Sequence, residues 1–217
     1  MNSYDTVLFD LDGTLIESKL GITKSVQYSL SKFGFVENNL NDLEKFIGPP
    51  LQGSFQKYYN LNEKESWAAV EYYREYFDKK GIFENNIYDG IPELLNILKS
   101  QGKILEIATS KPTYYAKKII ENYKLDSYFA HIVGSHKNLT RISKTEIIEH
   151  ALSLLRDVNK KKVIMIGDKE HDIIGAKNNN IDSIGVGYGY GSKEELEGAR
   201  PTYIIPSVRE LSNFFSQ

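Results

Sequence analysis

Apolar positions along this chain follow two alternating patterns. Short continuous apolar runs are typical of strands buried on both faces of a parallel sheet, whereas apolar residues recurring every three or four positions predict helices. The expected strands cover residues 6–9, 103–108, 131–135, 162–166 and 183–186. The expected helices cover residues 91–100, 114–123, 145–155 and 173–178. Strands that alternate with helices predict an α/β fold, a Rossmann-like parallel sheet with helices on both faces.

The segment from residue 16 to about residue 83 has a different character, because it contains only helical patterns and no expected strand. Apolar and aromatic residues recur at helical spacing in two groups: Ile22, Val26, Leu30 and Phe33, then Trp67, Val70, Tyr73 and Phe77. Between them lies Gly48-Pro49-Pro50, which the interior of a helix cannot contain. We expect a helical insert that buries its own apolar faces, with hinges at residues 13–16 and 83–86.

Composition narrows the class of protein. The chain has 217 residues, of which 41% are hydrophobic and 12% aromatic, so it can build one large domain or two modest ones. Its formal net charge of −2 predicts no nucleic-acid polymer and no membrane surface as a partner. It has no cysteine, which excludes disulfides and thiol chemistry. No signal peptide or membrane span is recognisable, and we expect a soluble, cytoplasmic protein.

Residues suited to catalysis follow several of the expected strands. In parallel sheets ligands bind outside the carboxyl ends of the strands, so these side chains are expected to share one pocket. The residues are Asp10, Asp12, Thr109, Ser110, Asp168 and Asp172, with Lys144 before an expected helix. Crowded carboxylates are held ionised by a divalent cation, and Mg²⁺ with lysine and hydroxyl donors suits phosphoryl transfer. A carboxylate can itself attack phosphorus and form an aspartyl-phosphate.

The order of these motifs carries a resemblance to a known family. The chain resembles the haloacid dehalogenase-like phosphatase superfamily in the order of four motifs. They are Asp10-Leu11-Asp12-Gly13-Thr14-Leu15, then Ala-Thr-Ser-Lys-Pro at 108–112, a lysine, and Ile-Gly-Asp-x-x-x-Asp at 166–172. Residues 46–51 and 188–191 are similar to its phosphoglycolate phosphatase-like branch. The resemblance covers essentially the whole chain. It implies a catalytic α/β core at 1–15 and 84–217 and a small all-helical cap domain at 16–83, inserted after the first strand.

The resemblance also implies roles for the candidate residues. Asp10 is the expected nucleophile and Asp12 the general acid–base, while Thr109 and Lys144 contact the phosphoryl group. Mg²⁺ is expected on Asp10, Asp12, Asp168 and Asp172, with Asp12 acting through its backbone carbonyl. Lys137 is a competing candidate for the phosphate lysine. Further contacts to phosphate or substrate are expected from backbone N–H groups near Leu11, Ser110 and Lys111, and from Lys45 and Arg74 in the cap.

The implied function is Mg²⁺-dependent hydrolysis of a small, phosphoglycolate-like phosphate monoester through an aspartyl-phosphate, by a monomer or weak homodimer. A 5'-nucleotidase or pyrophosphatase of the same fold is the alternative, and a phosphomutase uses the same aspartates. A receiver-like signalling protein is disfavoured because the helical insert directly follows the first strand. A non-catalytic protein that binds phosphorylated ligands is disfavoured because Asp12 has little use without turnover.

Overall fold

The computed structural model describes residues 4–136, 141 and 143–216. Lys137 therefore lies outside the described residues. The described chain divides into two compact units, one formed by the residues up to Glu17 and from Ile87 onward, the other by Ser18–Asn86. The assignment of these units as catalytic core and cap, and the two expected hinges, stay predictions. Among the described residues, every helix is too short or too polar to span a bilayer.

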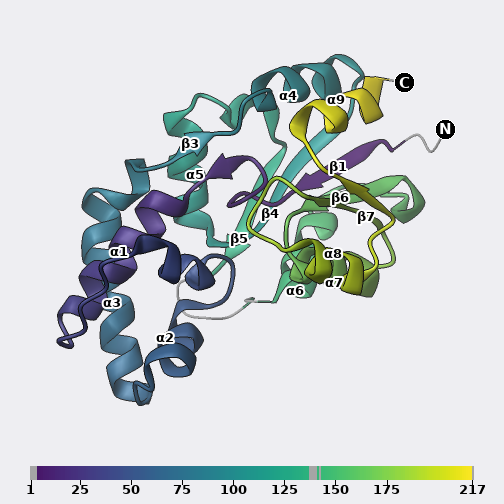
Figure 1. Cartoon of the computed structure of the whole chain (residues 1–217). Helices are drawn as coiled ribbons and strands as arrows, with labels where there is room; N and C mark the ends of the chain where they lie inside the picture. Colours follow the sequence, from purple (N-terminus) through teal and green to yellow (C-terminus); the bar gives the residue numbers. More distant parts are fainter. Residues whose placement is uncertain (1–3, 137–140, 142, 217) are drawn as a thin grey trace. The chain divides into compact units, whose positions relative to one another are not determined.

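The larger unit contains a six-stranded sheet in the order β5-β4-β1-β6-β7-β8, and every pairing in it is parallel. The strands are β1 (Thr6–Phe9), β4 (Ile104–Pro112), β5 (His131–Ser135), β6 (Val163–Gly167), β7 (Asp182–Val186) and β8 (Tyr203–Ile205). The helices are α4 (Ile91–Ser100), α5 (Thr113–Asn122), α6 (Lys144–Ser153), α7 (Glu170–Asn178), α8 (Lys193–Ala199) and α9 (Val208–Ser216). Helices α4 and α9 lie on one side of the sheet, and α6 and α7 on the other (Figure 1). This confirms the predicted fold class.

The core of this unit explains why β1 is a continuous apolar run. Val7, Leu8 and Phe9 are completely buried, because helices cover both faces of the central strand. On one face, Leu8 and Met165 from the sheet pack with residues from α6 and α7. Burying a side chain of this size contributes about 1.5–3 kcal/mol. The packing therefore holds β1 firmly in the middle of the sheet, with Asp10 directly after it.

The register of β1 aligns the ends of three strands. Phe9 pairs with Ile107 on β4 and with Ile166 on β6. The backbone N–H of Asp10 donates to the carbonyl of Ile166 at 2.8 Å. The residues that follow these positions, including Thr109 and Asp168, consequently emerge at the same edge of the sheet. This alignment is what gathers residues from distant parts of the sequence.

The smaller unit is built from helices. They are α1 (Lys19–Ser31), η1 (Leu40–Phe46), α2 (Leu51–Tyr59), α3 (Glu63–Lys79) and η2 (Gly81–Phe83). Helix α2 begins directly after Pro50, and Phe46 packs against Phe55 with ring centroids 5.0 Å apart. The prediction that residues 16–83 contain no strand is wrong in one detail: β2 (Ile16–Glu17) pairs with β3 (Asn86–Ile87). Such a short pairing has no periodicity for a sequence pattern to reveal.

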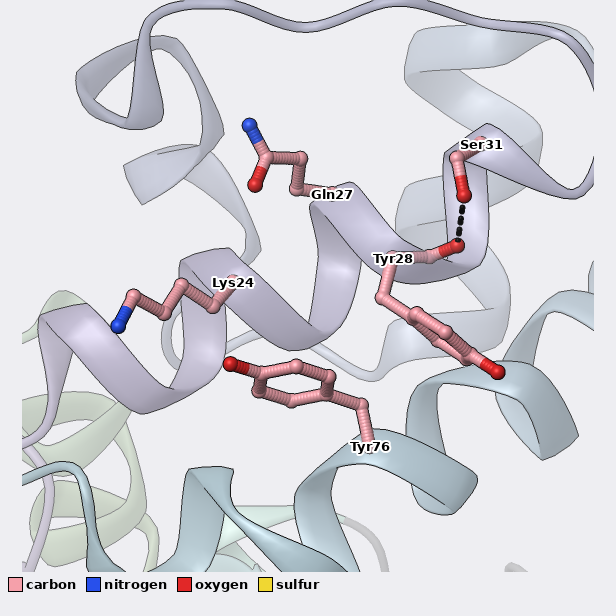
Figure 2. Close-up of a pocket in the computed structure, with 5 residues that line it drawn as sticks. All are labelled: Lys24, Gln27, Tyr28, Ser31 and Tyr76. Carbon is pink, nitrogen blue, oxygen red and sulfur yellow. Dashed lines mark hydrogen bonds between the residues drawn. The ribbon is translucent and has the colours of Figure 1, made fainter.

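Helices α1 and α3 border a pocket of about 350 Å³ in this unit (Figure 2). It is lined by Lys24, Gln27, Tyr28, Ser31 and Tyr76. Its polar groups interact with the protein itself, since Lys24 Nζ pairs with Glu84 Oε1 at 2.8 Å. Tyr76 donates to the same carboxylate oxygen at 3.4 Å. We therefore assign no ligand to this pocket.

A buried carboxylate lies inside the larger sheet. Glu106 on β4 is fully buried, and its Oε1 lies 2.5 Å from His131 Nδ1 on β5. Within the described residues, its Oε2 accepts no hydrogen bond. Burial raises the pKa of Glu106 from 4.5 to about 6, although the neighbouring His131 acts to lower it. Protonation of Glu106 therefore favours the folded state.

This predicts an unusual pH dependence of stability. Because the folded chain binds the Glu106 proton more tightly than the unfolded chain, the favourable contribution is lost as pH rises from about 4.5 to about 6. From well below pH 4.5 to well above pH 6, the unfolding free energy of wild type should fall by about 2 kcal/mol in total relative to that of Glu106→Gln. Urea denaturation of both proteins measures the difference, with the exposed substitution Glu121→Gln as control. A difference independent of pH would contradict the prediction.

Candidate active site

Three aspartates converge at the carboxyl edge of the sheet. Asp10 follows β1, Asp168 follows β6, and Asp172 lies in the first turn of α7. Each contributes a carboxylate oxygen to a cluster whose members lie within 4.8 Å of one another. Their exposed fractions are only 8%, 0% and 1%. Carboxylates packed this closely and this deeply repel one another unless positive charge is supplied.

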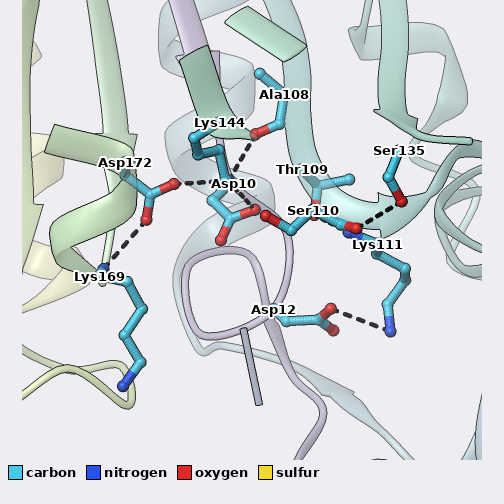
Figure 3. A network of polar contacts seen from close by, with 10 residues as sticks. All are labelled: Asp10, Asp12, Ala108, Thr109, Ser110, Lys111, Ser135, Lys144, Lys169 and Asp172. Atoms are coloured by element: carbon cyan, nitrogen blue, oxygen red, sulfur yellow. Dashed lines mark hydrogen bonds and ion pairs between the residues drawn. The ribbon is translucent and has the colours of Figure 1, made fainter. Parts of the chain in front are cut away.

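Lys144 supplies one positive charge to this cluster (Figure 3). Its Nζ lies 2.7 Å from Asp10 Oδ1 and 2.6 Å from Asp172 Oδ1, and it donates to the carbonyl of Ala108 at 2.9 Å. Lys144 is the first residue of α6, whose start is fixed by a capping box between Ser143 and Glu146. The cap therefore aims the lysine into the site. Its predicted contact with phosphate stays a prediction.

The pKa values in the cluster show that the positive charge of Lys144 only partly offsets the effect of burial on the carboxylates. Burial lowers the pKa of Lys144, but the carboxylates of Asp10 and Asp172 outweigh that effect and raise it overall. Burial raises the pKa of Asp172 to about 6, with Lys144 opposing and Asp10 adding to the shift. The pKa of Asp168 is raised well above its ordinary value by burial, then by Asp10 and Asp172. Lys144 pairs with Asp10 and Asp172, whereas the N–H of Tyr190 and the charge of Lys169 are what act to lower the pKa of Asp168.

The donor set fits a hard divalent cation. Asp168 Oδ1 is buried and accepts no hydrogen bond from the described residues, while Oδ2 accepts the N–H of Tyr190 at 2.7 Å. One oxygen of Asp168 is thus fixed and the other is left for a ligand. Mg²⁺ prefers such carboxylate oxygens and commonly binds through few protein ligands and several waters. Asp10, Asp168 and Asp172 therefore suit Mg²⁺ well.

The second predicted aspartate reaches the site through a tight turn. Gly13 has a φ of +86°, and its N–H donates to the carbonyl of Ile16 at 2.8 Å. A Cβ at Gly13 would lie 2.2 Å from Asp168 Oδ2, so only glycine fits there. Asp12 then forms an ion pair with Lys111, with 3.0 Å between Oδ2 and Nζ. Lys111 was expected to contribute only its backbone N–H, and this contact of its side chain was not predicted.

The end of β4 contributes the remaining predicted groups. Thr109 is 1% exposed, and its Oγ1 accepts the backbone N–H of Lys111 at 3.2 Å. The carbonyl of Ser110 accepts the hydroxyl of Ser135 at 2.8 Å. Leu11 is fully buried beside Asp10. The structure gathers Thr109, Ser110 and Lys111 with the aspartates (Figure 3). Their contacts with phosphate stay predictions.

Two predicted anion contacts belong to the other compact unit. The ammonium of Lys45, in η1, lies 4.9 Å from the ring centroid of Tyr58 and 5.4 Å from that of Tyr59. Arg74, in α3, pairs with Glu71 at 2.6 Å. Both residues thus have partners within the helical unit. Because the carboxylate cluster belongs to the larger unit, the contact of Lys45 and Arg74 with substrate stays a prediction.

Comparisons with known proteins identify the family. A model described as haloacid dehalogenase-like hydrolase matches residues 7–186. A solved structure described as a predicted phosphatase from Clostridium acetobutylicum is 50% identical and has a TM-score of 0.94, covering 99% of each chain. A Pseudomonas aeruginosa protein named 5'-nucleotidase is 45% identical over 96% of this chain and 94% of its own.

More distant relatives have other names. Tyrosine-protein kinase PtkA from Mycobacterium tuberculosis is 33% identical over 91% of this chain and 67% of its own length. A phosphoglycolate phosphatase from Colwellia psychrerythraea is 28% identical over 95% of each chain. The predicted resemblance to the superfamily is therefore confirmed.

The geometry predicts that Lys144 is essential to stability when no divalent cation is present. Removing one partner of a buried ion pair typically costs 3–5 kcal/mol, so Lys144→Met should lower the unfolding free energy by about 3 kcal/mol. Denaturation in chelator measures this. The control is Lys162→Met, which removes a half-exposed pair with Asp5 and should cost less than about 1 kcal/mol. Equal losses in the two variants would contradict the prediction.

Proposed function

Because the chain belongs to the haloacid dehalogenase-like hydrolase family, we propose that it is a Mg²⁺-dependent phosphatase acting through an aspartyl-phosphate on Asp10. One observation carries this proposal: Asp10 is paired with the ammonium of Lys144 and shares a buried cluster with the carboxylates of Asp168 and Asp172. A carboxylate held in this way has a fixed position and a partly neutralised charge. Both properties suit it to attack phosphorus.

The first chemical step transfers the phosphoryl group to the protein. An oxygen of Asp10 attacks phosphorus while the ester P–O bond breaks and its electron pair moves to the leaving oxygen. Protonated Asp12 gives its proton to that oxygen, so a neutral alcohol departs. In the second step Asp12 removes a proton from water, whose oxygen attacks phosphorus and releases inorganic phosphate. Asp10 is regenerated as a carboxylate.

Other residues stabilise charge during these steps. Lys144 keeps Asp10 in place and neutralises part of the charge on the phosphoryl oxygens, and the Thr109 hydroxyl donates to one of them. Mg²⁺, held by the side chains of Asp10, Asp168 and Asp172 and the backbone carbonyl of Asp12, would reduce repulsion between nucleophile and phosphoryl group. The Lys111 ion pair holds Asp12 beside the turn at Gly13.

For the substrate, we take a nucleoside 5'-monophosphate as the first candidate. The relative named 5'-nucleotidase is 45% identical, against 28% for the one named phosphoglycolate phosphatase, and each alignment covers over nine-tenths of this chain. The phosphoglycolate-like substrate predicted from sequence motifs is the competing candidate. Cytoplasmic location and a monomer or weak homodimer stay predictions.

Phosphate release across a substrate panel tests the proposed function. The panel contains nucleoside 5'-monophosphates, phosphoglycolate, sugar phosphates and pyrophosphate, each assayed with Mg²⁺ and with chelator. We expect release from nucleoside 5'-monophosphates, at least tenfold faster than from phosphoglycolate, and none in chelator. Preference for phosphoglycolate or pyrophosphate would change the substrate while keeping the reaction class. No release from any compound would contradict the phosphatase and favour a mutase or a binding protein.

A matched variant separates catalysis by Asp10 from contaminating activity. Asp10→Asn keeps the size of the side chain and removes the nucleophilic carboxylate, so turnover should be abolished. Its circular dichroism spectrum should match that of wild type, which shows that the fold is kept. Activity retained in this variant would contradict the role of Asp10.

A further inference from the structure

We propose that Lys169 and Glu195 are positioning residues that hold the loop at residues 187–192 against Asp168 and thereby fix Asp168 as a metal ligand. The inference rests on the proposed function, because it concerns the same Mg²⁺ site. Neither residue reaches the substrate-facing groups in this scheme. Lys169 acts through the backbone of Tyr190, and Glu195 acts through Lys169.

The loop encloses Asp168 closely. The N–H of Tyr190 donates to Asp168 Oδ2 at 2.7 Å. A Cβ added at Gly189 would lie 2.4 Å from Asp168 Cβ, and one added at Gly191 would lie 1.8 Å from the Asp168 carbonyl oxygen. Both glycines are therefore required for the backbone to approach this closely. The contact fixes one oxygen of Asp168 and determines where the other, Oδ1, points.

Lys169 and Glu195 tie this loop to the residue that follows Asp168. Lys169 Nζ donates to the carbonyl of Tyr190 at 3.0 Å and lies 3.5 Å from Glu195 Oε2. Glu195 Oε1 accepts the backbone N–H of Glu170 at 3.0 Å. The carboxylate of Glu195 thus links the start of α8 to the start of α7. The N–H of Tyr190 contacts Asp168, and the carbonyl of the same residue is held by the ammonium of Lys169.

The other end of the loop is anchored to the turn that carries Asp12. The hydroxyl of Tyr188 donates to the carbonyl of Thr14 at 3.0 Å, and its ring packs edge-on against that of Tyr88. The loop is therefore held at both ends, with the Tyr190 N–H between them. This arrangement gives a structural role to the motif Tyr188-Gly189-Tyr190-Gly191 and to Glu195. None of these residues takes part in the proposed reaction itself.

The charge of Lys169 makes the sign of its effect diagnostic. A lysine near a carboxylate cluster opposes a divalent cation through simple repulsion, so removing it would tighten Mg²⁺ binding if charge were its only influence. A positioning role has the opposite consequence, because a loosened loop no longer orients Asp168. Loss of such supporting contacts commonly weakens metal binding 10–100-fold.

Calorimetric titration with Mg²⁺ alone, without substrate, measures this effect. Lys169→Met removes the ammonium and keeps the aliphatic stem, and we expect its Mg²⁺ affinity to fall about tenfold. Lys169→Arg keeps a donor for both the carbonyl and the carboxylate and should restore affinity to within about threefold of wild type. Glu195→Gln should also weaken binding and serves as a second variant if Lys169→Met does not fold.

The control is Lys177→Met on α7, the helix that begins directly after Lys169. Lys177 also donates to a backbone carbonyl, that of Ala199, but it takes no part in the contacts around Asp168. Its Mg²⁺ affinity should equal that of wild type. Unchanged or tighter binding in folded Lys169→Met would overturn the inference and leave the proposed function intact. If the wild-type protein itself does not bind Mg²⁺, both the Mg²⁺ dependence in the proposed function and the positioning role of Lys169 and Glu195 are contradicted.

Discussion

The arrangement of the site depends on one ammonium group placed among buried carboxylates. Lys144 contacts Asp10 and Asp172 at once, and Asp168 completes the cluster with no cation of its own at contact distance among the described residues. Buried ion pairs cost desolvation energy and seldom stabilise a fold more than apolar packing does. The cluster therefore has to be held by the rest of the unit. The buried strand β1, the capped start of α6 and the first turn of α7 each position one of its members.

The sequence patterns were sufficient for five of the six strands of the sheet and for most of the cluster. Continuous apolar runs such as residues 6–9 and 162–166 exist because the sheet is covered on both faces, and parallel strands bring their carboxyl ends to one edge. The convergence of Asp10 and Asp168 at this edge could consequently be predicted from the apolar runs that precede them. Lys144 needed the family resemblance, because a lysine at a helix start usually faces solvent.

Other features could not be predicted, for physical reasons. The N–H of Tyr190 belongs to the backbone and has no residue type that identifies it as a donor to Asp168. The Lys111 side chain pairs with Asp12 where β4 is irregular between Thr109 and Pro112, and the regular alternation of a strand cannot be used to place a side chain there. The strand β8 was not predicted, since Tyr203–Ile205 is too short to show a period. The helices α8 and α9 were not predicted either.

The groups at the carboxyl edge of the sheet indicate the class of reaction but do not identify the substrate. Asp10, Lys144 and Thr109 would act on the phosphoryl group, which nucleotides, phosphoglycolate and pyrophosphate all share. Relatives that match this chain over more than nine-tenths of its length are named for different substrates, 5'-nucleotidase and phosphoglycolate phosphatase. We expect discrimination among substrates to come from residues of the helical unit, where Lys45 and Arg74 are the predicted anion contacts.

The most direct test of the central claim is a crystal structure of the wild-type protein grown with Mn²⁺ as a substitute for Mg²⁺. Anomalous scattering identifies the ion without reference to activity. The account predicts one strong anomalous peak within about 2.5 Å of carboxylate oxygens of Asp10 and Asp168, with Lys144 still paired to Asp10. A fully loaded crystal with no peak there, or a peak elsewhere on the protein, would contradict it.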